Sequence, residues 1–231
     1  MSEPRTPPGG ALLWLLVALP IVLQLAITTL GIALVGAVAE LPERMAFYSL
    51  PQAAVVLGAY VAFGAATLLV ARRIGPLREV LAVRRTPLGS AIGLAVLGLV
   101  AGLAIAALLE PIFHGAESQN LDPGPFPGTT AAAVAAACSA VSVVIGASVT
   151  EELYFRGLLY GRLDARFARA AAVIGSAGAF GLAHFQPDAF PTLFALGLIL
   201  GLLRMRTGSI WPAVGLHAAN NGIAFAYLLA S

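Results

Sequence analysis

The stretch that decides the fold is residues 130–167, TAAAVAAACSAVSVVIGASVTEELYFRGLLYGRLDARF. Its first 20 residues are small or apolar, and the run then continues into two adjacent carboxylates, Glu151 and Glu152, followed by Arg156. A run of about 20 apolar residues is long enough to cross a bilayer as a helix. Ionisable groups inside such a span are costly and usually face a cavity or one another. The stretch therefore predicts a membrane helix that carries a functional site.

The composition of the whole chain supports the same conclusion. It is 59% hydrophobic and only 10% charged, and its mean hydropathy of +0.92 is well above that of soluble domains. A soluble helical protein with an apolar core is the competing interpretation, and this composition argues against it. Apolar stretches recur along the chain, at 11–39, 52–71, 88–109, 129–149, 170–185, 191–203 and 211–230.

Four or five of these stretches are long enough to span a bilayer outright, whereas 191–203 is short and is expected to be tilted or partly re-entrant. We therefore predict an all-α fold, a polytopic transmembrane helical bundle with seven spans, or eight if the helix near 150–165 is broken. No internal repeat or soluble domain is visible. Residues 1–128 are expected to form N-terminal transmembrane helices without a readable motif, and residues 129–231 a helical core that carries the polar groups described below.

The distribution of arginines predicts the orientation in the membrane. Eleven of the 13 basic residues fall in the amino-terminal segment, in 72–85, in 162–169 and in 204–210. The intervening loops, 40–50 and 110–128, hold one arginine against five acidic residues. Because arginine-rich loops stay on the cytoplasmic side, we expect a multi-pass protein of the cell membrane with a cytoplasmic amino terminus and the 110–128 loop outside.

Three of the apolar stretches carry polar groups to a similar depth. Glu151 and His217 each lie eleven residues from a flanking arginine, and His184 lies fifteen residues from one. At 1.5 Å per helical residue these separations are about 16 Å for the first two and about 22 Å for His184. The common depth indicates that three helices bring these groups to one site.

Spacing then assigns the polar groups to helix faces. Glu152 and Arg156 are four residues apart, in the order that favours an ion pair on one helix. Glu151 points about 100° away from Glu152, so it is free to face another helix. His217 and Asn221 are also four residues apart and project from one face. The pattern predicts a charge-balanced helix that presents Glu151 to its neighbours.

Taken together, these polar clusters resemble the motifs of the CPBP family, which comprises CAAX proteases and bacteriocin-processing enzymes and is also called Abi. The clusters occur in the family's order and each lies on an apolar segment; they are EExxxR at 151–156, FxxxH at 180–184 and HxxxN at 217–221. The resemblance covers roughly residues 130–230. It implies an intramembrane glutamic endopeptidase, like the type II CAAX prenyl endopeptidases, with a helical bundle around a catalytic cavity open toward the cytoplasm.

The resemblance also implies roles for single residues. Four residues are implied as catalytic: Glu151, His184, His217 and Asn221. Glu151 with His184 would activate a water for attack on a peptide carbonyl. His217 and Asn221 would donate N–H groups to the developing oxyanion. Glu152 and Arg156 would support the site by balancing charge and orienting Glu151.

Other functions fit part of the same pattern. Two histidines and a glutamate can bind zinc, so a zinc-dependent intramembrane metalloprotease is an alternative, although no HExxH motif is present. A membrane scaffold or bacteriocin self-immunity protein would use the polar groups to bind without cutting. A proton-coupled transporter would need polar groups along a through-path, and the outer halves of these spans carry almost none.

The metal-free protease scheme requires no cofactor. Its expected partners are the lipid bilayer and a peptide or protein substrate, lipidated or not; no feature indicates binding of nucleic acid. The substrate itself cannot be read from the sequence. A membrane-embedded peptide, a bacteriocin precursor and a signalling protein all fit.

Overall fold

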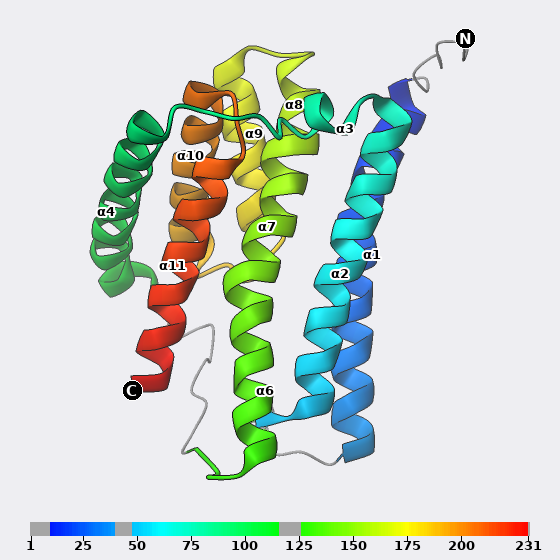
Figure 1. The fold of residues 1–231 in the computed structure, drawn as a ribbon, viewed down its shortest axis with the longest axis vertical. Helices are drawn as coiled ribbons and strands as arrows, with labels where there is room; N and C mark the ends of the chain where they lie inside the picture. The colour runs from blue at the N-terminus through cyan, green and yellow to red at the C-terminus, as the bar shows by residue number, and fades with distance from the viewer. Residues whose placement is uncertain (1–9, 40–47, 116–125, 231) are drawn as a thin grey trace.

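The computed structural model describes residues 10–39, 48–115 and 126–230 of the chain, and every regular element among them is helical (Figure 1). Four long helices are α1 (Gly10–Ala39), α2 (Leu50–Ile74), α4 (Leu88–Phe113) and α11 (Trp211–Ala230). Helical backbone satisfies its own hydrogen bonds, which a chain this apolar requires in lipid. The predicted all-α fold is confirmed.

The stretch quoted above forms one continuous helical run at the centre of the bundle (Figure 1). Its parts are α6 (Thr130–Ala140), the π-helical η2 (Val141–Ala147), α7 (Ser148–Glu151), the π-helical η3 (Glu152–Leu159) and α8 (Tyr160–Asp164). π-Helical turns inside α-helices are rare and occur often at functional sites. The run is not broken near 150–165, so that segment contributes one span and not two.

The helices α9 (Arg169–Leu182) and α10 (Phe190–Thr207) form a short hairpin beside this run. At 1.5 Å per residue, α9 is about 21 Å long, well short of the bilayer's hydrocarbon core of about 30 Å, and α10 is about 27 Å long, close to it. Figure 1 shows the hairpin in the same half of the molecule as α8 and the short α3 (Leu77–Val80). Its turn therefore lies inside the thickness that the central run spans.

Five helices are long and apolar enough to cross a membrane: α1, α2, α4, the central run and α10. Helix α9 is shorter, and α11 has the length but carries His217 and two asparagines, which make it less apolar. With these two the apolar helices number seven among the described residues, five of them candidate spans, which is roughly consistent with the expected seven or eight spans. The chain is a multi-pass membrane protein.

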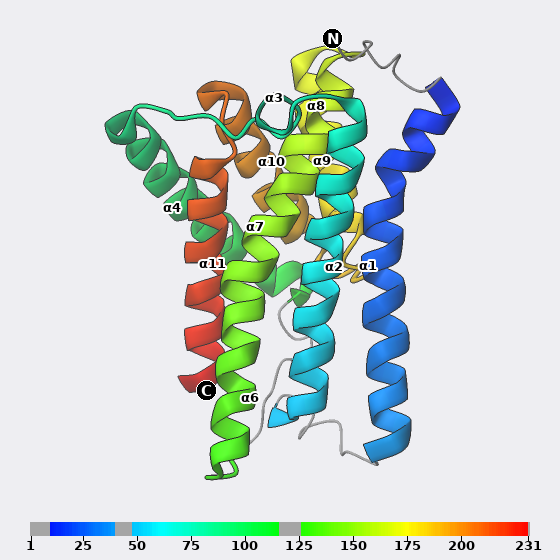
Figure 2. The ribbon, with the colours of Figure 1, turned by 45° about the vertical axis from the view of Figure 1, so that its right-hand side comes forward.

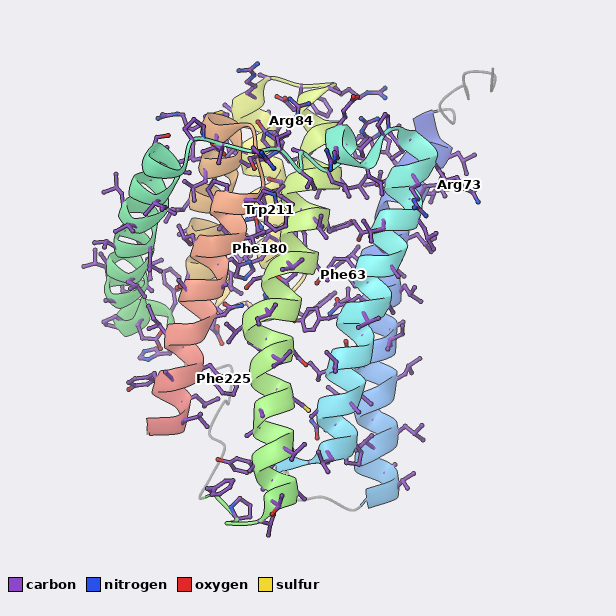
Figure 3. The ribbon with its side chains drawn as sticks, viewed as in Figure 1. Phe63, Arg73, Arg84, Phe180, Trp211 and Phe225 are labelled. Carbon is purple, nitrogen blue, oxygen red and sulfur yellow. The ribbon has the colours of Figure 1, made fainter. Side chains whose placement is uncertain are left out.

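The arginine-rich segments gather at one end of the bundle. Figure 3 places Arg73 and Arg84 at the same end as α3 and α8, whereas Phe225 lies toward the opposite end. The carboxyl-terminal end of α11 also lies toward that opposite end (Figure 1). Part of the predicted outer loop, residues 116–125, and the segments 1–9 and 40–47 lie outside the described residues.

Small residues let α9 and α10 approach closely. A Cβ atom on Gly197 would lie 3.0 Å from the Cα of Ala177, and one on Gly201 would lie 3.1 Å from a methyl group of Val173. Two glycines four residues apart on α10 thus face Ala177 and Val173 on α9, and small residues on one helix are what lets membrane helices approach closely. The close approach brings the bare backbone of α10 within reach of side chains on η3.

The buried core draws on both halves of the chain. Val17 of α1 and Phe63 of α2 belong to the same hydrophobic cluster as Phe155, Phe180 and Leu216. Figure 2, turned by 45°, shows α1 and α2 side by side along the central run, with Pro20 inside α1. Helices α1 and α2 therefore form one side of the structure that holds the polar groups, whereas α4 packs against α10 and α11 on the other side (Figure 1).

Candidate active site

Glu151 and Glu152 stand where α7 passes into η3, and both are buried, with 8% and 0% of their surface exposed. They occupy adjacent positions, so their side chains leave the helix in different directions, as predicted. Glu152 contacts Arg156 on its own helical run and His217 of α11, whereas Glu151 faces Tyr60 of α2 and the same histidine. The two carboxylates therefore share His217 and differ in their other partners.

Glu152 holds a buried network of charged and polar groups. Its Oε1 accepts hydrogen bonds from Arg156 Nη1 at 2.9 Å and from His217 Nδ1 at 3.0 Å. Arg156 is fully buried, and its Nη2 donates to the carbonyl oxygen of Gly197 at 3.0 Å. Its guanidinium carbon also lies 4.6 Å from the centre of the Phe180 ring. The predicted Glu152–Arg156 ion pair is present, and it extends to His217.

His217 lies between the two glutamates. Its Nδ1 is bonded to Glu152, and its Nε2 lies 4.0 Å from Oε2 of Glu151. A carboxylate beside Nδ1 places the proton on that nitrogen, which fixes the tautomer and leaves Nε2 to face the other glutamate. The separation of 4.0 Å is too long for a direct hydrogen bond. It is short enough for Glu151 and Nε2 of His217 to contact the same reacting group.

His184 lies in the turn just after α9 and is only partly buried. Its Nδ1 lies 2.8 Å from the carbonyl oxygen of Phe180, one of the last carbonyls of the helix. A carbonyl accepts and does not donate, so Nδ1 carries the proton and Nε2 has a free lone pair. His184 and Glu151 line one cavity of about 80 Å³.

Phe180 packs against both histidines. Its ring centre lies 4.9 Å from that of His184 and 5.7 Å from that of His217, in each case edge to face. Figure 3 shows Phe180 inside the bundle, with Phe63 of α2 nearby on the other side of the central run. The aromatic ring thus makes edge-to-face contact with both imidazoles.

Asn221 lies one turn beyond His217 on α11 and is held against η2. Its Nδ2 donates to the carbonyl oxygen of Val143 at 3.0 Å, and its Oδ1 accepts a long hydrogen bond of 3.5 Å from Asn220. An amide nitrogen has two hydrogens, so one N–H of Asn221 remains for another acceptor. The contact with Val143 sets the direction of that group.

Sequence reasoning missed two residues of the N-terminal helices. Tyr60 of α2 donates a hydrogen bond to Oε1 of Glu151 at 3.3 Å, and Gln24 of α1 lines the same cavity as Glu151 and His184. Tyrosines of membrane helices usually lie at the interfaces, so a tyrosine in the middle of a 25-residue helix is a sequence signal for a polar partner inside the span. Tyr60 lies about 18 Å along the helix from Arg72, a depth similar to that predicted for Glu151.

A larger apolar pocket adjoins the polar cavity. It has a volume of about 670 Å³ and lies between α1, the end of α9 and the turn that leads into α10. The two spaces share Ile21, Leu25 and Ala183 in their walls. Leu182 and Phe185, which also line the larger pocket, are 65% and 74% exposed. An apolar group could therefore lie beside the reacting site while it remains in contact with lipid.

The two histidines bear on the zinc alternative. Among residues 10–39, 48–115 and 126–230, no three His, Cys, Asp or Glu side chains are arranged to hold a metal ion. The Nδ1 atoms of both histidines contact protein acceptors, an arrangement that metal-ligating histidines also show. The zinc alternative therefore stays a hypothesis.

Comparison with known proteins assigns the carboxyl-terminal half. Residues 133–223 match the family described as Type II CAAX prenyl endopeptidase Rce1-like. This segment therefore carries an Rce1-like domain, and the resemblance to the CPBP family is confirmed. At the level of the family, the domain is that of an intramembrane endopeptidase. No curated protein and no solved structure matches the chain.

Proposed function

We propose that this protein is an intramembrane endopeptidase that hydrolyses peptide bonds of a membrane-associated protein or peptide without a metal. The observation that supports this most is the shared cavity of Glu151 and His184, with Nε2 of His217 4.0 Å from Oε2 of Glu151. A carboxylate and an imidazole in one cavity lined by aromatic rings, with a second imidazole beside the carboxylate, are suited to proton transfer away from bulk water.

In the first step Glu151 accepts a proton from a water molecule while the water oxygen attacks the scissile carbonyl carbon. His184 orients that water, because its Nδ1–H is held by Phe180 and its Nε2 is left as an acceptor. The polar cavity of about 80 Å³ has room for a water. Glu151 and His184 thus form the water-activating pair.

The attack creates a negatively charged oxygen that needs donors. Glu152 is placed to stabilise the protonated form of His217, whose Nε2–H then donates to the oxyanion. The second N–H of Asn221, free of Val143, is the other donor. When the tetrahedral intermediate collapses, the C–N bond breaks and the proton held by Glu151 passes to the leaving nitrogen. The products are a carboxylate and an amine.

The adjoining apolar pocket indicates the kind of substrate. Its lining residues are apolar apart from Gln186, and its volume of about 670 Å³ suits a hydrocarbon chain or a bulky apolar side chain. A lipidated peptide would place its lipid there and its scissile bond at Glu151. The arginine-rich end of the bundle is proposed to face the cytoplasm, and the substrate would be cleaved below that face.

The test is a comparison of protein termini in the membranes of cells that produce wild-type protein, Glu151→Gln or the control Glu79→Gln. Glu79 is an exposed residue of α3, so its substitution removes the same charge outside the site. Gln keeps the size of Glu but cannot accept a proton. We expect a set of new termini with wild type and Glu79→Gln that is missing with Glu151→Gln. Identical termini in all three samples would refute the proposed function.

A further inference from the structure

Tyr60 is a residue of the N-terminal half that touches the proposed general base. It lies on α2, outside the segment 133–223 that matches the endopeptidase family. Its hydroxyl donates to Oε1 of Glu151 at 3.3 Å, and its side chain lines the cavity that also contains His184. A phenol that donates to a carboxylate makes a charge-assisted contact, and at 3.3 Å this one is longer than most O–H···O hydrogen bonds.

The position of Tyr60 is determined by close packing of α2 on the central run. Gly146 of η2 lies beside the ring: a Cβ there would be 3.7 Å from Tyr60 Cβ and 3.9 Å from Cδ2. One turn further along α2, Gly64 lies so near the central run that its Cβ would be 2.9 Å from a methyl group of Thr150. A Cβ on Gly146 would make ordinary van der Waals contact with the ring, whereas one on Gly64 would require Thr150 or α2 to shift. The hydroxyl is therefore held at Glu151 by helix packing.

An interfacial role does not account for this residue. Tyr60 lies ten residues after the start of α2 and fourteen before its end, about 15 Å and 21 Å along the helix. Tyrosines that anchor a helix lie near its ends, at the level of the lipid head groups. In the middle of the span a hydroxyl needs a partner, and the partner of this one is Glu151.

The contact makes the two oxygens of Glu151 different. Oε1 is bonded to Tyr60, and Oε2 lies 4.0 Å from His217. We propose that Tyr60 is a positioning residue: it holds Oε1, prevents rotation of the carboxylate and keeps Oε2 directed at the reacting water. This inference rests on the proposed endopeptidase function. It gives the N-terminal helices, which carry no motif, a part in completing the site.

The test uses the Tyr60→Phe variant, which keeps the ring and removes only the hydroxyl. The matched control is Tyr154→Phe, since Tyr154 is buried in the same core, with its ring centre 5.1 Å from that of Phe63 and 4.9 Å from that of Phe155. Cleavage of a peptide substrate by purified protein gives kcat and KM, and thermal unfolding reports folding. Wild type and Glu151→Gln are measured beside them.

We expect Tyr60→Phe to lower kcat about 10- to 100-fold, the fold-change for loss of a hydrogen bond to a charged group. KM and the melting temperature should stay near wild type, and Tyr154→Phe should retain wild-type kcat within about twofold. A normal kcat in Tyr60→Phe, or a raised KM with kcat unchanged, would overturn the proposal. Equal losses of kcat in both tyrosine variants, together with lowered melting temperatures, would also overturn it, because they would indicate a general packing defect. Failure of the proposed function itself would be seen separately, as full activity of Glu151→Gln.

Discussion

Removal of Arg156 should destabilise the protein more than removal of any surface charge. The guanidinium is fully buried, 2.9 Å from Glu152 and 3.0 Å from the carbonyl oxygen of Gly197. In Arg156→Ala the carboxylate of Glu152 loses its permanent counter-charge and keeps only His217 as a partner. Breaking a buried pair in this way costs about 3 to 5 kcal/mol.

The expected change in melting temperature follows from that free energy. In a protein of this size 1 kcal/mol corresponds to about 2 to 4 °C, so Arg156→Ala should melt roughly 6 to 20 °C below wild type. The assay is thermal unfolding in detergent at one fixed scan rate, followed by the fluorescence of Trp14 and Trp211. Arg169→Ala is the control, because that arginine is 77% exposed and lies 4.0 Å from Asp164. Its loss should cost less than about 1 kcal/mol.

A second substitution separates charge from lost packing. Glu152→Gln in the Arg156→Ala background removes the uncompensated charge while it keeps the shape of the side chain. We expect the double variant to melt above Arg156→Ala, though below wild type, since the space left by the arginine remains. The reasoning is refuted if Arg156→Ala melts like Arg169→Ala. It is also refuted if Glu152→Gln gives no recovery.

Two further results are expected. The first result concerns orientation and uses a Cys138→Ala background. A membrane-impermeant thiol reagent applied from outside should label a cysteine placed at the exposed Thr130 and spare one placed at the exposed Arg78. Labelling at position 78 alone would reverse the orientation. Asn221→Ala should lower kcat and kcat/KM together, by about 10²- to 10³-fold, because it removes a proposed oxyanion donor. Asn220→Ala removes the same amide from the neighbouring position and should have little effect; equal losses at both positions would indicate a packing defect.

The sequence predicted the features that depend on local spacing. The helical bundle and the Glu152–Arg156 pair four residues apart both follow from the helical repeat. A common depth for Glu151 and His217 also followed from counting residues, and the two side chains lie 4.0 Å apart. Which roles these residues have remains a prediction.

The contacts between helices could not be predicted in the same way. Glu152 and His217 are 65 residues apart in the chain, and Tyr60 and Glu151 are 91 apart. Such pairs depend on which helix faces meet, and this is set by the close approach of small residues such as Gly197. The π-helical turns of η2 and η3 also shift the faces away from those that an ideal repeat gives.

The most direct test of the central claim is hydrolysis by the purified protein in the presence of EDTA. Substrates from the comparison of termini would be incubated with wild type, Glu151→Gln, His184→Ala and Glu79→Gln, each checked for folding by its melting temperature. The account predicts cleavage at the same bond by wild type and Glu79→Gln, unaffected by EDTA, and none by the two site variants. Cleavage by folded Glu151→Gln, or loss of wild-type cleavage on removal of metal, would contradict it.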